Sequence, residues 1–185
     1  MKIFALLVVL FMVLPLKRSQ ALEEKVDHIQ FFKGSICDIK VGAFIGDILH
    51  DGEIIEVEKN SELGNPYFIF NINVFECGIV RAYASDQRLE IYRLETESNK
   101  YSTSRGAKNG MTLNEISVLY PDGELLKPTK LSLAESASYF LPNDEGFFTF
   151  DTNLLTVHSK DECLKNIPNC IQYIGHLKAH KFETY

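Results

Sequence analysis

The sequence lacks the motifs that carry chemistry in many small enzymes. It contains no His-Glu-x-x-His zinc motif, no glycine-rich phosphate loop, no Gly-x-Ser-x-Gly turn and no Ser-x-x-Lys box. Proline and glycine are also sparse, with 6 and 11 in 185 residues, which argues against a disordered chain. Because 45% of the residues are hydrophobic, the chain can bury a core of ordinary size, as one compact domain or two small fused units.

Positive charge is scarce as well. The chain has 19 Lys and Arg against 25 Asp and Glu, a formal net charge of −6. Such a surface repels nucleic acid and anionic lipid headgroups, so neither is an expected partner. The negative charge therefore predicts another protein as the partner and favours a basic one.

The N-terminus has the pattern of an export signal. Its apolar run "IFALLVVLFMVLPL" ends at Leu16, which is short for a membrane span and typical of a signal-peptide core. Ser19 and Ala21 are small residues at the usual recognition positions, so we expect residues 1–21 to be a signal peptide, cleaved after Ala21. An uncleaved anchor is the alternative. Cleavage predicts a periplasmic or secreted protein with no membrane span.

The four cysteines all follow this segment. An even number in an exported chain predicts disulfides. The spacing favours a bond between Cys163 and Cys170, at the two ends of a short loop with proline and asparagine, and this leaves Cys37 to pair with Cys77. Other pairings remain open.

Alternating apolar and polar residues predict an antiparallel meander in the first half, with strands within residues 51–60, 65–84 and 88–97. In the second half, strands are expected at residues 137–141, 147–159 and 170–182. The last two are expected to form a hairpin, with a disulfide between Cys163 and Cys170 closing the connection between them.

Aromatic residues lie on both faces of some of these strands, notably in "YFIF" and "FFTF". Most such side chains are buried, so we assign them to the core. One set exposed as a partner-binding surface is the alternative. The assigned set is Tyr67, Phe68, Phe70, Phe75, Phe147, Phe148 and Phe150.

A short frame occurs twice. "KNGMTLNEI" at residues 108–116 repeats the spacing of "KVGAFIGDI" at residues 40–48. In the second copy Thr112 and Glu115 have the T-x-x-E spacing of a capping box, which predicts a helix start. In the first copy Phe44 stands where Thr112 caps, and its side chain cannot accept a backbone amide.

The glycines of the frame, Gly42 and Gly110, are interpreted as structural, because each admits the chain into a helix through a conformation that other residues resist. Each half therefore runs from a glycine turn through a short helix into strands. The expected fold is α+β. It is a single exported domain over residues 22–185, made of two tandem degenerate units, about 35–100 and 101–185, each a short helix followed by an antiparallel β meander.

The run "YSTSRGAKNGMTLNEISVLYPDGEL", with the earlier "IKVGAFIGDI", resembles exported bacterial proteins with a tandem G-[ML]-[ST]-x-x-[DE]-[IV] repeat. This uncharacterised family includes the sigma-E-regulated lipoprotein of enterobacteria. More distantly, the repeat is similar to the outer-membrane assembly lipoprotein SmpA/OmlA and to the beta-lactamase inhibitor protein. The resemblance implies a fold and an envelope location, and no catalytic residues come with it. The chain departs from the family in lacking a lipobox cysteine and in its C-terminal cysteine loop.

Two histidines, His176 and His180, have a spacing that could suggest zinc. In the expected strand their imidazoles would lie about 13 Å apart, so we predict no metal. Asp144 and Glu145 lie in "PNDEG", which is turn chemistry. We therefore expect no catalytic residue and no cofactor.

These observations favour an exported, non-enzymatic protein-interaction module, such as an inhibitor, an immunity-type protein or an envelope accessory protein. A small periplasmic ligand-binding protein or hydrolase, with its site between the two units, is the alternative. A lipid- or cell-wall-associated structural protein is a third hypothesis.

Overall fold

The computed structural model describes residues 34–50, 52–126, 132–144, 146–166 and 169–185, which all belong to the second of the chain's two units, residues 31–185. The expected signal peptide, residues 1–21, lies outside the described residues. Of the helices in the described ranges, none is long and apolar enough to cross a membrane.

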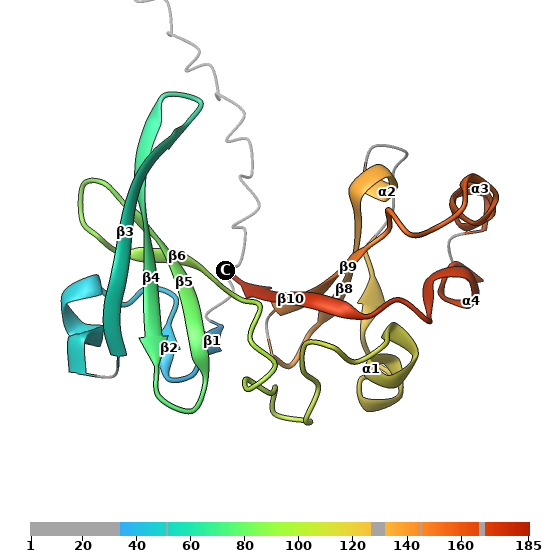
Figure 1. Ribbon diagram of the computed structural model, residues 1–185, viewed down its shortest axis with the longest axis horizontal. Coiled ribbons are helices and arrows are strands. Elements are labelled where there is room, and N and C mark those ends of the chain that lie inside the picture. The colour runs from blue at the N-terminus through green and yellow to red at the C-terminus, as the bar shows by residue number, and fades with distance from the viewer. Residues whose placement is uncertain (1–33, 51, 127–131, 145, 167–168) are drawn as a thin grey trace, which may run out of the picture. The chain divides into compact units, whose positions relative to one another are not determined.

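The first half contains a small hairpin, a 3-10 helix and four strands (Figure 1). These are β1 (Ser35–Ile36), β2 (Ile39–Lys40), η1 (Ile45–His50), β3 (Gly52–Glu62), β4 (Asn65–Val74), β5 (Gly78–Ser85) and β6 (Ile91–Thr96). The second half contains α1 (Leu113–Leu119), β7 (Glu124–Leu125), α2 (Ser132–Glu135), β8 (Ser136–Leu141), β9 (Gly146–Asp151), α3 (Val157–Lys165), α4 (Ile171–Ile174) and β10 (Ala179–Thr184).

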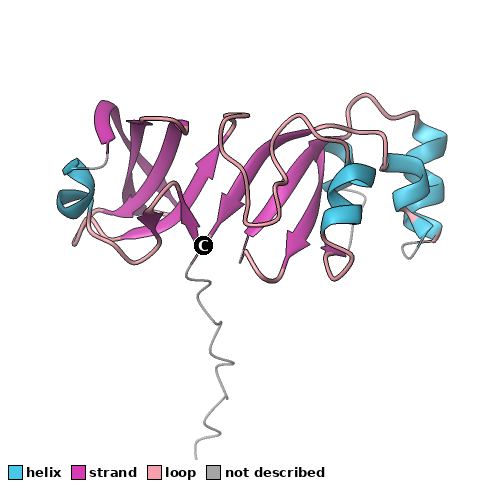
Figure 2. Cartoon of the chain, turned by 90° about the horizontal axis from the view of Figure 1, so that it is seen from below, coloured by secondary structure: helices cyan, strands magenta, loops and turns pink. Residues whose placement is uncertain are grey.

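One antiparallel sheet of eight strands dominates the structure, in the order β3-β4-β5-β6-β10-β9-β8-β7. The last strand, β10, pairs with β6 on one side and β9 on the other, and so joins the two halves of the sheet. Figure 2 shows the strands side by side, with helices towards both ends. A large antiparallel sheet with a few helices agrees with the predicted α+β class.

The helix start predicted from "GMTLNE" is present at α1. The Thr112 side chain accepts the Glu115 amide at 3.3 Å, and the Glu115 carboxylate accepts the Thr112 amide at 2.7 Å. Leu113, Ile116 and Tyr120 are fully buried, as their i, i+3, i+7 spacing predicts. The first copy of the frame forms the 3-10 helix η1.

The two glycine turns have matching hydrogen bonds. Gly42 donates its amide to Ile91 of β6, and Gly110 donates its amide to Ala179 of β10, each at 2.7 Å. Both glycines have left-handed backbones, with φ of 87° and 93°, a region that glycine enters without the steric cost of a Cβ.

Both disulfides join the cysteines that the spacing pairs. Cys37 bonds to Cys77, which ties the β1–β2 turn to the β4–β5 turn. Cys163 bonds to Cys170.

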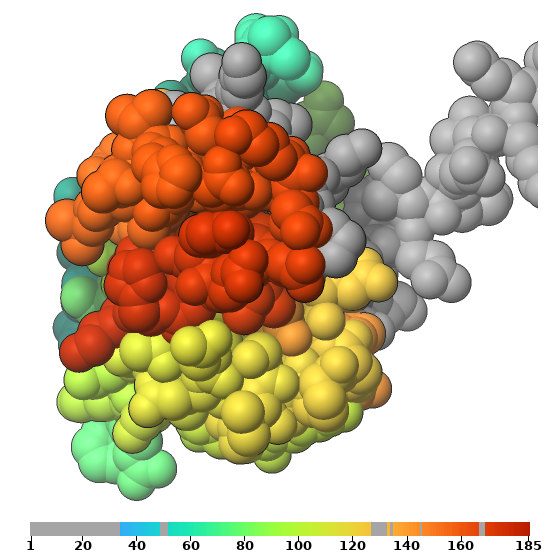
Figure 3. All heavy atoms as spheres, turned by 90° about the vertical axis from the view of Figure 1, so that its right-hand side faces the viewer, coloured from blue at the N-terminus to red at the C-terminus, as the bar shows by residue number. Residues whose placement is uncertain are grey.

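The predicted C-terminal hairpin is only partly correct. Strands β9 and β10 do pair, but residues 157–165 and 171–174 form α3 and α4 between them. The disulfide Cys163–Cys170 therefore joins α3 to the start of α4; the two helices lie against each other, and α4 lies between α3 and α1 (Figure 3). Alternation alone cannot separate a strand from a short helix in such a mixed segment.

The predicted aromatic core is only partly correct. Tyr67, Phe68 and Phe147 are half-buried, and Phe75 lies in the β4–β5 turn and is 87% exposed. Phe70, Phe148 and Phe150 are buried as predicted. The run from Phe68 to Val74 alternates regularly, but Phe75 comes after the strand has ended, so the alternation no longer predicts burial there.

Candidate functional site

The two faces of the sheet differ in chemistry. On β5, Val80, Ala82 and Ala84 are fully buried, whereas Arg81 and Tyr83 alternate with them and point to the other face. The helix α1 lies on the buried side, since the Tyr139 hydroxyl of β8 donates to the Tyr120 carbonyl at the end of α1. We call the other face, with the side chains of Tyr67, Arg81, Tyr83, Tyr92, Arg93, Glu95, Phe147, Thr149, Lys181, Glu183 and Tyr185, the open face.

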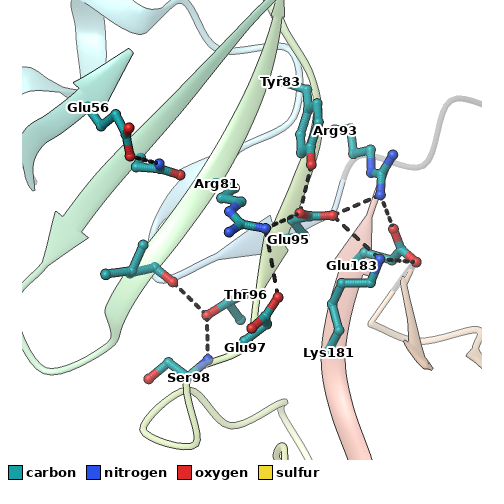
Figure 4. A network of polar contacts seen from close by, with 12 residues as sticks. Glu56, Arg81, Tyr83, Arg93, Glu95, Thr96, Glu97, Ser98, Lys181 and Glu183 are labelled. Atoms are coloured by element: carbon teal, nitrogen blue, oxygen red, sulfur yellow. Dashed lines mark hydrogen bonds and ion pairs between the residues drawn. The ribbon is translucent and has the colours of Figure 1, made fainter. Parts of the chain in front are cut away.

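Two glutamates meet at the centre of the open face (Figure 4). Glu95 of β6 and Glu183 of β10 are directly opposite each other in the register, and their side chains are only 5% and 7% exposed. Like charges placed opposite each other destabilise a sheet. The pair therefore requires cations beside it.

Arg93 supplies the closest cation. Its Nη2 lies 2.8 Å from Glu95 Oε2 and 2.7 Å from Glu183 Oε2, so one nitrogen bridges both carboxylates. Lys181 Nζ lies 3.6 Å from Glu95 and 3.5 Å from Glu183. Arg81, on the outer side, is 3.4 Å from Glu95. Three cations thus enclose two carboxylates.

Neutral hydroxyls complete the cluster. Tyr83 donates to Glu95 Oε1 at 2.7 Å, and Thr149 of β9 donates to Glu183 Oε1 at 3.2 Å. Burial by itself raises the pKa of Glu95, but the hydrogen bond from Tyr83 and the charges of Arg93 and Lys181 outweigh it and leave the pKa below its ordinary value. Burial, followed by the bond to Glu95, raises the pKa of Tyr83. Glu95 is therefore ionised and Tyr83 neutral at physiological pH.

Tyrosines surround this cluster on the open face. Tyr67, Tyr83 and Tyr92 form a triangle with ring centroids 6.2 to 6.5 Å apart. The Arg93 guanidinium lies 4.6 Å from the Tyr83 ring and 5.5 Å from that of Tyr185. Tyr92 remains 40% exposed. Rigid aromatic rings, fixed over a neutralised charge cluster, present a large amphipathic surface.

Two surface hollows flank the tyrosines. One, of about 310 Å³, is lined by Ile79, Arg81, Glu95, Thr96, Glu97 and Ser98. The other, of about 390 Å³, lies at the β3–β4 turn and includes Leu63, Tyr67 and Tyr92. The open face therefore has hollows that could accept side chains of a partner.

A larger polar cleft, of about 560 Å³, lies beside the Cys37–Cys77 disulfide. Residues from before and after position 100 line it, including Asp38, Glu76 and Asp144. Asp144 accepts hydrogen bonds from the Ser104 amide at 3.0 Å and from the Tyr120 hydroxyl. The Ser104 hydroxyl also donates to it at 3.1 Å, so the cleft holds a carboxylate already bonded to three donors.

The residues singled out by the sequence are separate from these two surfaces, except for Cys37, Cys77 and Asp144 at the cleft and Tyr67 and Phe147 on the open face. Glu145 lies outside the described residues. Gly42, Gly110, Thr112 and Glu115 start helical turns. Cys163 and Cys170 are fully buried in the α3–α4 region. Each of these residues is therefore explained by its part in a turn, a helix start or a disulfide.

The histidines also fall outside any site. His176 follows α4 and His180 lies in β10, so the two are not in one strand as predicted, and both are exposed. Within the part of the chain that the structure describes, no three His, Cys, Asp or Glu side chains are grouped to hold a metal ion.

The charge cluster of Arg93, Glu95, Lys181 and Glu183 was not predicted, although the sequence contains a signal for it. Residues 93–96 read Arg-Leu-Glu-Thr and residues 181–184 read Lys-Phe-Glu-Thr. In both segments a cation precedes a glutamate by two positions, which places the two side chains on one face of a strand. The repeat identifies two similar strands, but only the strand order shows that they are neighbours.

Comparisons with known proteins give a fold and no function. No protein-family model matches the sequence, and no curated protein matches it. Among solved structures, the chain is similar to the uncharacterized protein yfeY from Escherichia coli, with a TM-score of 0.55 and 11% sequence identity, over 82% of this chain and 96% of that one. At this identity the likeness concerns the fold alone.

Proposed function

We propose that this protein is an exported, non-enzymatic interaction module that binds a protein partner through the open face of its sheet. The observation that carries the proposal is the group of Tyr67, Tyr83 and Tyr92, in which Tyr83 joins the other two rings to Arg93 and to the buried Glu95.

The composition of this face supports the proposal. Tyrosine and arginine are enriched among the residues that dominate protein–protein binding energies. Binding to a preformed surface costs little conformational entropy, and Arg93 is already fixed by two carboxylates and two rings. The inhibitor, immunity-type and envelope accessory roles all require such a surface.

Export is supported by the two disulfides. Disulfides persist in the periplasm or outside the cell and are rare in the cytosol. The pairs Cys37–Cys77 and Cys163–Cys170 are both disulfide-bonded. We infer a periplasmic or secreted protein.

We also infer that the chain consists of two tandem units, about 35–100 and 101–185. The matching bonds of Gly42 to Ile91 and Gly110 to Ala179 support this inference, since each glycine turn contacts the same position of its own closing strand. The bridges Phe44 to Glu90 and Thr112 to Lys178 repeat the match. The two closing strands, β6 and β10, pair at the glutamates, so the open face is centred where the proposed units meet.

The proposal is tested by affinity capture with the oxidised protein against envelope and culture fractions, followed by titration of the retained partner. We expect Tyr92→Ser to weaken binding by at least about 2 kcal/mol, roughly thirty-fold in Kd, as for truncation of a central tyrosine. Phe75→Ser is the matched control, because Phe75 is an exposed aromatic residue in the β4–β5 turn.

Two results would contradict the proposal. One is the absence of any saturable partner. The other is equal loss of affinity in Tyr92→Ser and Phe75→Ser, which would show that the open face has no special part in binding.

The polar cleft favours a second candidate, a ligand-binding protein or hydrolase with its site between the proposed units. Its lining comes from both, and burial, followed by the charge of Asp144, raises the pKa of Tyr101 there. Turnover or small-molecule binding that Asp144→Asn abolishes and Tyr92→Ser leaves unchanged would favour this function over protein binding.

A further inference from the structure

The sheet ends in a long strand. β3 has 11 residues and is exposed from Ile55 to Glu62, and among the residues that the structure describes it pairs with β4 alone, so its outer edge has no strand partner there. Such an edge offers unpaired N–H and C=O groups to a further strand. Edge strands of this kind can bind an extended peptide by adding it to the sheet.

The register shows which groups are free. Leu63 and Gly64 form a two-residue turn with φ of 49° and 82°, so Glu62 and Asn65 close the hairpin as a hydrogen-bonded pair. Bonded and non-bonded pairs then alternate along the ladder. Pro66, which has no N–H, falls in a non-bonded pair, consistent with this alternation.

The non-bonded residues of β3 are therefore Val57, Lys59 and Ser61, opposite Phe70, Phe68 and Pro66. Their backbone N–H and C=O groups point away from β4, to the outside of the sheet. The free edge thus supplies three residues in succession at the spacing that a strand requires.

The side chains of this edge are acidic on one face. Glu56, Glu58 and Glu62 alternate with the outward-bonding residues and so share the open face. Glu56 accepts a bond from Asn71 at 2.7 Å. Among the described residues no cation lies within 4.0 Å of Glu58 or Glu62, and the nearby Lys59 pairs with Asp86 instead, at 3.3 Å. An added strand with basic residues would neutralise these carboxylates.

A second copy of the chain fits this edge poorly. In an antiparallel pair of two β3 strands, the registers centred at positions 57, 58, 59 and 60 place glutamates opposite one another, whereas a register centred on Ser61 overlaps only the end of the strand and places Glu62 opposite Asn60. The opposed residues are Glu56 with Glu58, Glu58 with itself, Glu56 with Glu62, or Glu58 with Glu62. Like charges directly opposite destabilise a strand pair. The charge therefore selects a different, basic strand.

We propose that the β3 edge is a second binding site, which accepts an extended peptide segment of alternating basic and apolar residues as a ninth strand of the sheet. Its basic side chains lie beside Glu58 and Glu62, and its apolar ones lie beside Val57, which is 51% exposed on the other face. The bound segment receives and donates hydrogen bonds at Val57, Lys59 and Ser61.

The test uses the oxidised full chain and a short capped peptide that alternates lysine with valine. At a peptide concentration about ten times its Kd, amide hydrogen exchange at Val57, Lys59 and Ser61 should slow about tenfold, because the edge is then free about a tenth of the time. A peptide that alternates glutamate with valine is the matched probe and should give no slowing. If the lysine peptide does not slow amide exchange, or if both peptides slow it equally, the proposal is overturned. The glutamates would then serve to prevent strand addition at this edge.

Two variants separate the backbone from the charge. Val57→Pro removes one outward N–H without removing a bond to β4, and should weaken lysine-peptide binding at least about tenfold, whereas Val57→Thr should not. The double variant Glu58→Lys with Glu62→Lys keeps the edge and should reverse the preference, so that the glutamate peptide binds more tightly. Retained preference for lysine in this double variant contradicts the proposal even if Val57→Pro fails to fold.

Discussion

At the scale of single residues, the structure is organised around two carboxylates that could not stay together alone. Glu95 and Glu183 are buried and opposed, and among the described residues Arg93 alone bonds both at less than 3 Å. Removing one partner of a buried ionic cluster costs more than the cluster contributes, because it leaves an uncompensated buried charge.

We predict that Arg93→Ala lowers the free energy of unfolding by about 3 kcal/mol at neutral pH. Urea denaturation measures the change. Arg88→Ala, at an exposed arginine in the β5–β6 turn, is the control and should stay within about 0.5 kcal/mol of the parent. A loss of similar size in both variants would mean that the glutamate pair does not depend on Arg93.

The lowered pKa of Glu95 predicts a pH dependence. Because the folded-state pKa is below the unfolded value of about 4.3, the ionised carboxylate contributes stability above that pH, and the contribution is lost as pH falls towards the lower folded value. Unfolding free energies of the parent and of Glu95→Gln, measured across this acid range, should converge as pH falls. Parallel curves would contradict the lowered pKa.

At the scale of elements, local capping explains why the two copies of the frame differ. The second copy has Thr112 and Glu115 and forms an α-helix, whereas Phe44 replaces the cap in the first copy and a 3-10 helix follows. Burial of Ile45 and Ile48 supports that turn in place of a cap.

Thr112→Ala should therefore destabilise the protein by about 1 kcal/mol, the usual cost of losing an N-cap. In a chain of this size the melting temperature should fall by about 2–4 °C. Val118→Ala, on the exposed side of the same helix, is the control and should change stability little. An unchanged melting temperature in Thr112→Ala would show that packing alone holds α1.

The two disulfides should differ in their contribution. Cys37 and Cys77 are 40 positions apart, and Cys163 and Cys170 are 7 apart. Chain entropy predicts losses of about 4 and about 2.5 kcal/mol when each pair is replaced by alanine. Thermal denaturation of the two double variants checks the order, and the reverse order would show that local packing outweighs loop length.

How well a feature could be predicted from the sequence depends on how far apart along the chain its interacting residues lie. The capping box at Thr112, the glycine turns and the Phe68–Val74 strand depend on neighbours within a few positions, and their patterns predicted them correctly. Helix α4 and the start of α3 were predicted as strand, and the rest of α3 as the connecting loop, because short alternating segments with few helix signals do not determine the period. Opposition of Glu95 and Glu183 depends on strand order, which no local pattern specifies.

At the scale of the whole molecule, one sheet provides surfaces of two kinds. Its middle carries tyrosines and a neutralised charge cluster, and its β3 edge carries unpaired backbone groups beside acidic side chains. The first suits a folded partner and the second an extended basic segment. Because Glu62 lines the same hollow as Tyr67 and Tyr92, substitution of the edge glutamates should affect both surfaces, whereas Val57→Pro, on the opposite face, should leave binding at the tyrosines intact.

Hydroxyl-radical footprinting of the protein with and without its captured partner tests whether the open face binds a protein. We expect slower labelling of Tyr67 and Tyr92 in the complex, with Phe75 unchanged, because the tyrosines are covered and the turn is not. Unchanged labelling of both tyrosines, with protection confined to Tyr101 and the polar cleft, would contradict binding at the open face.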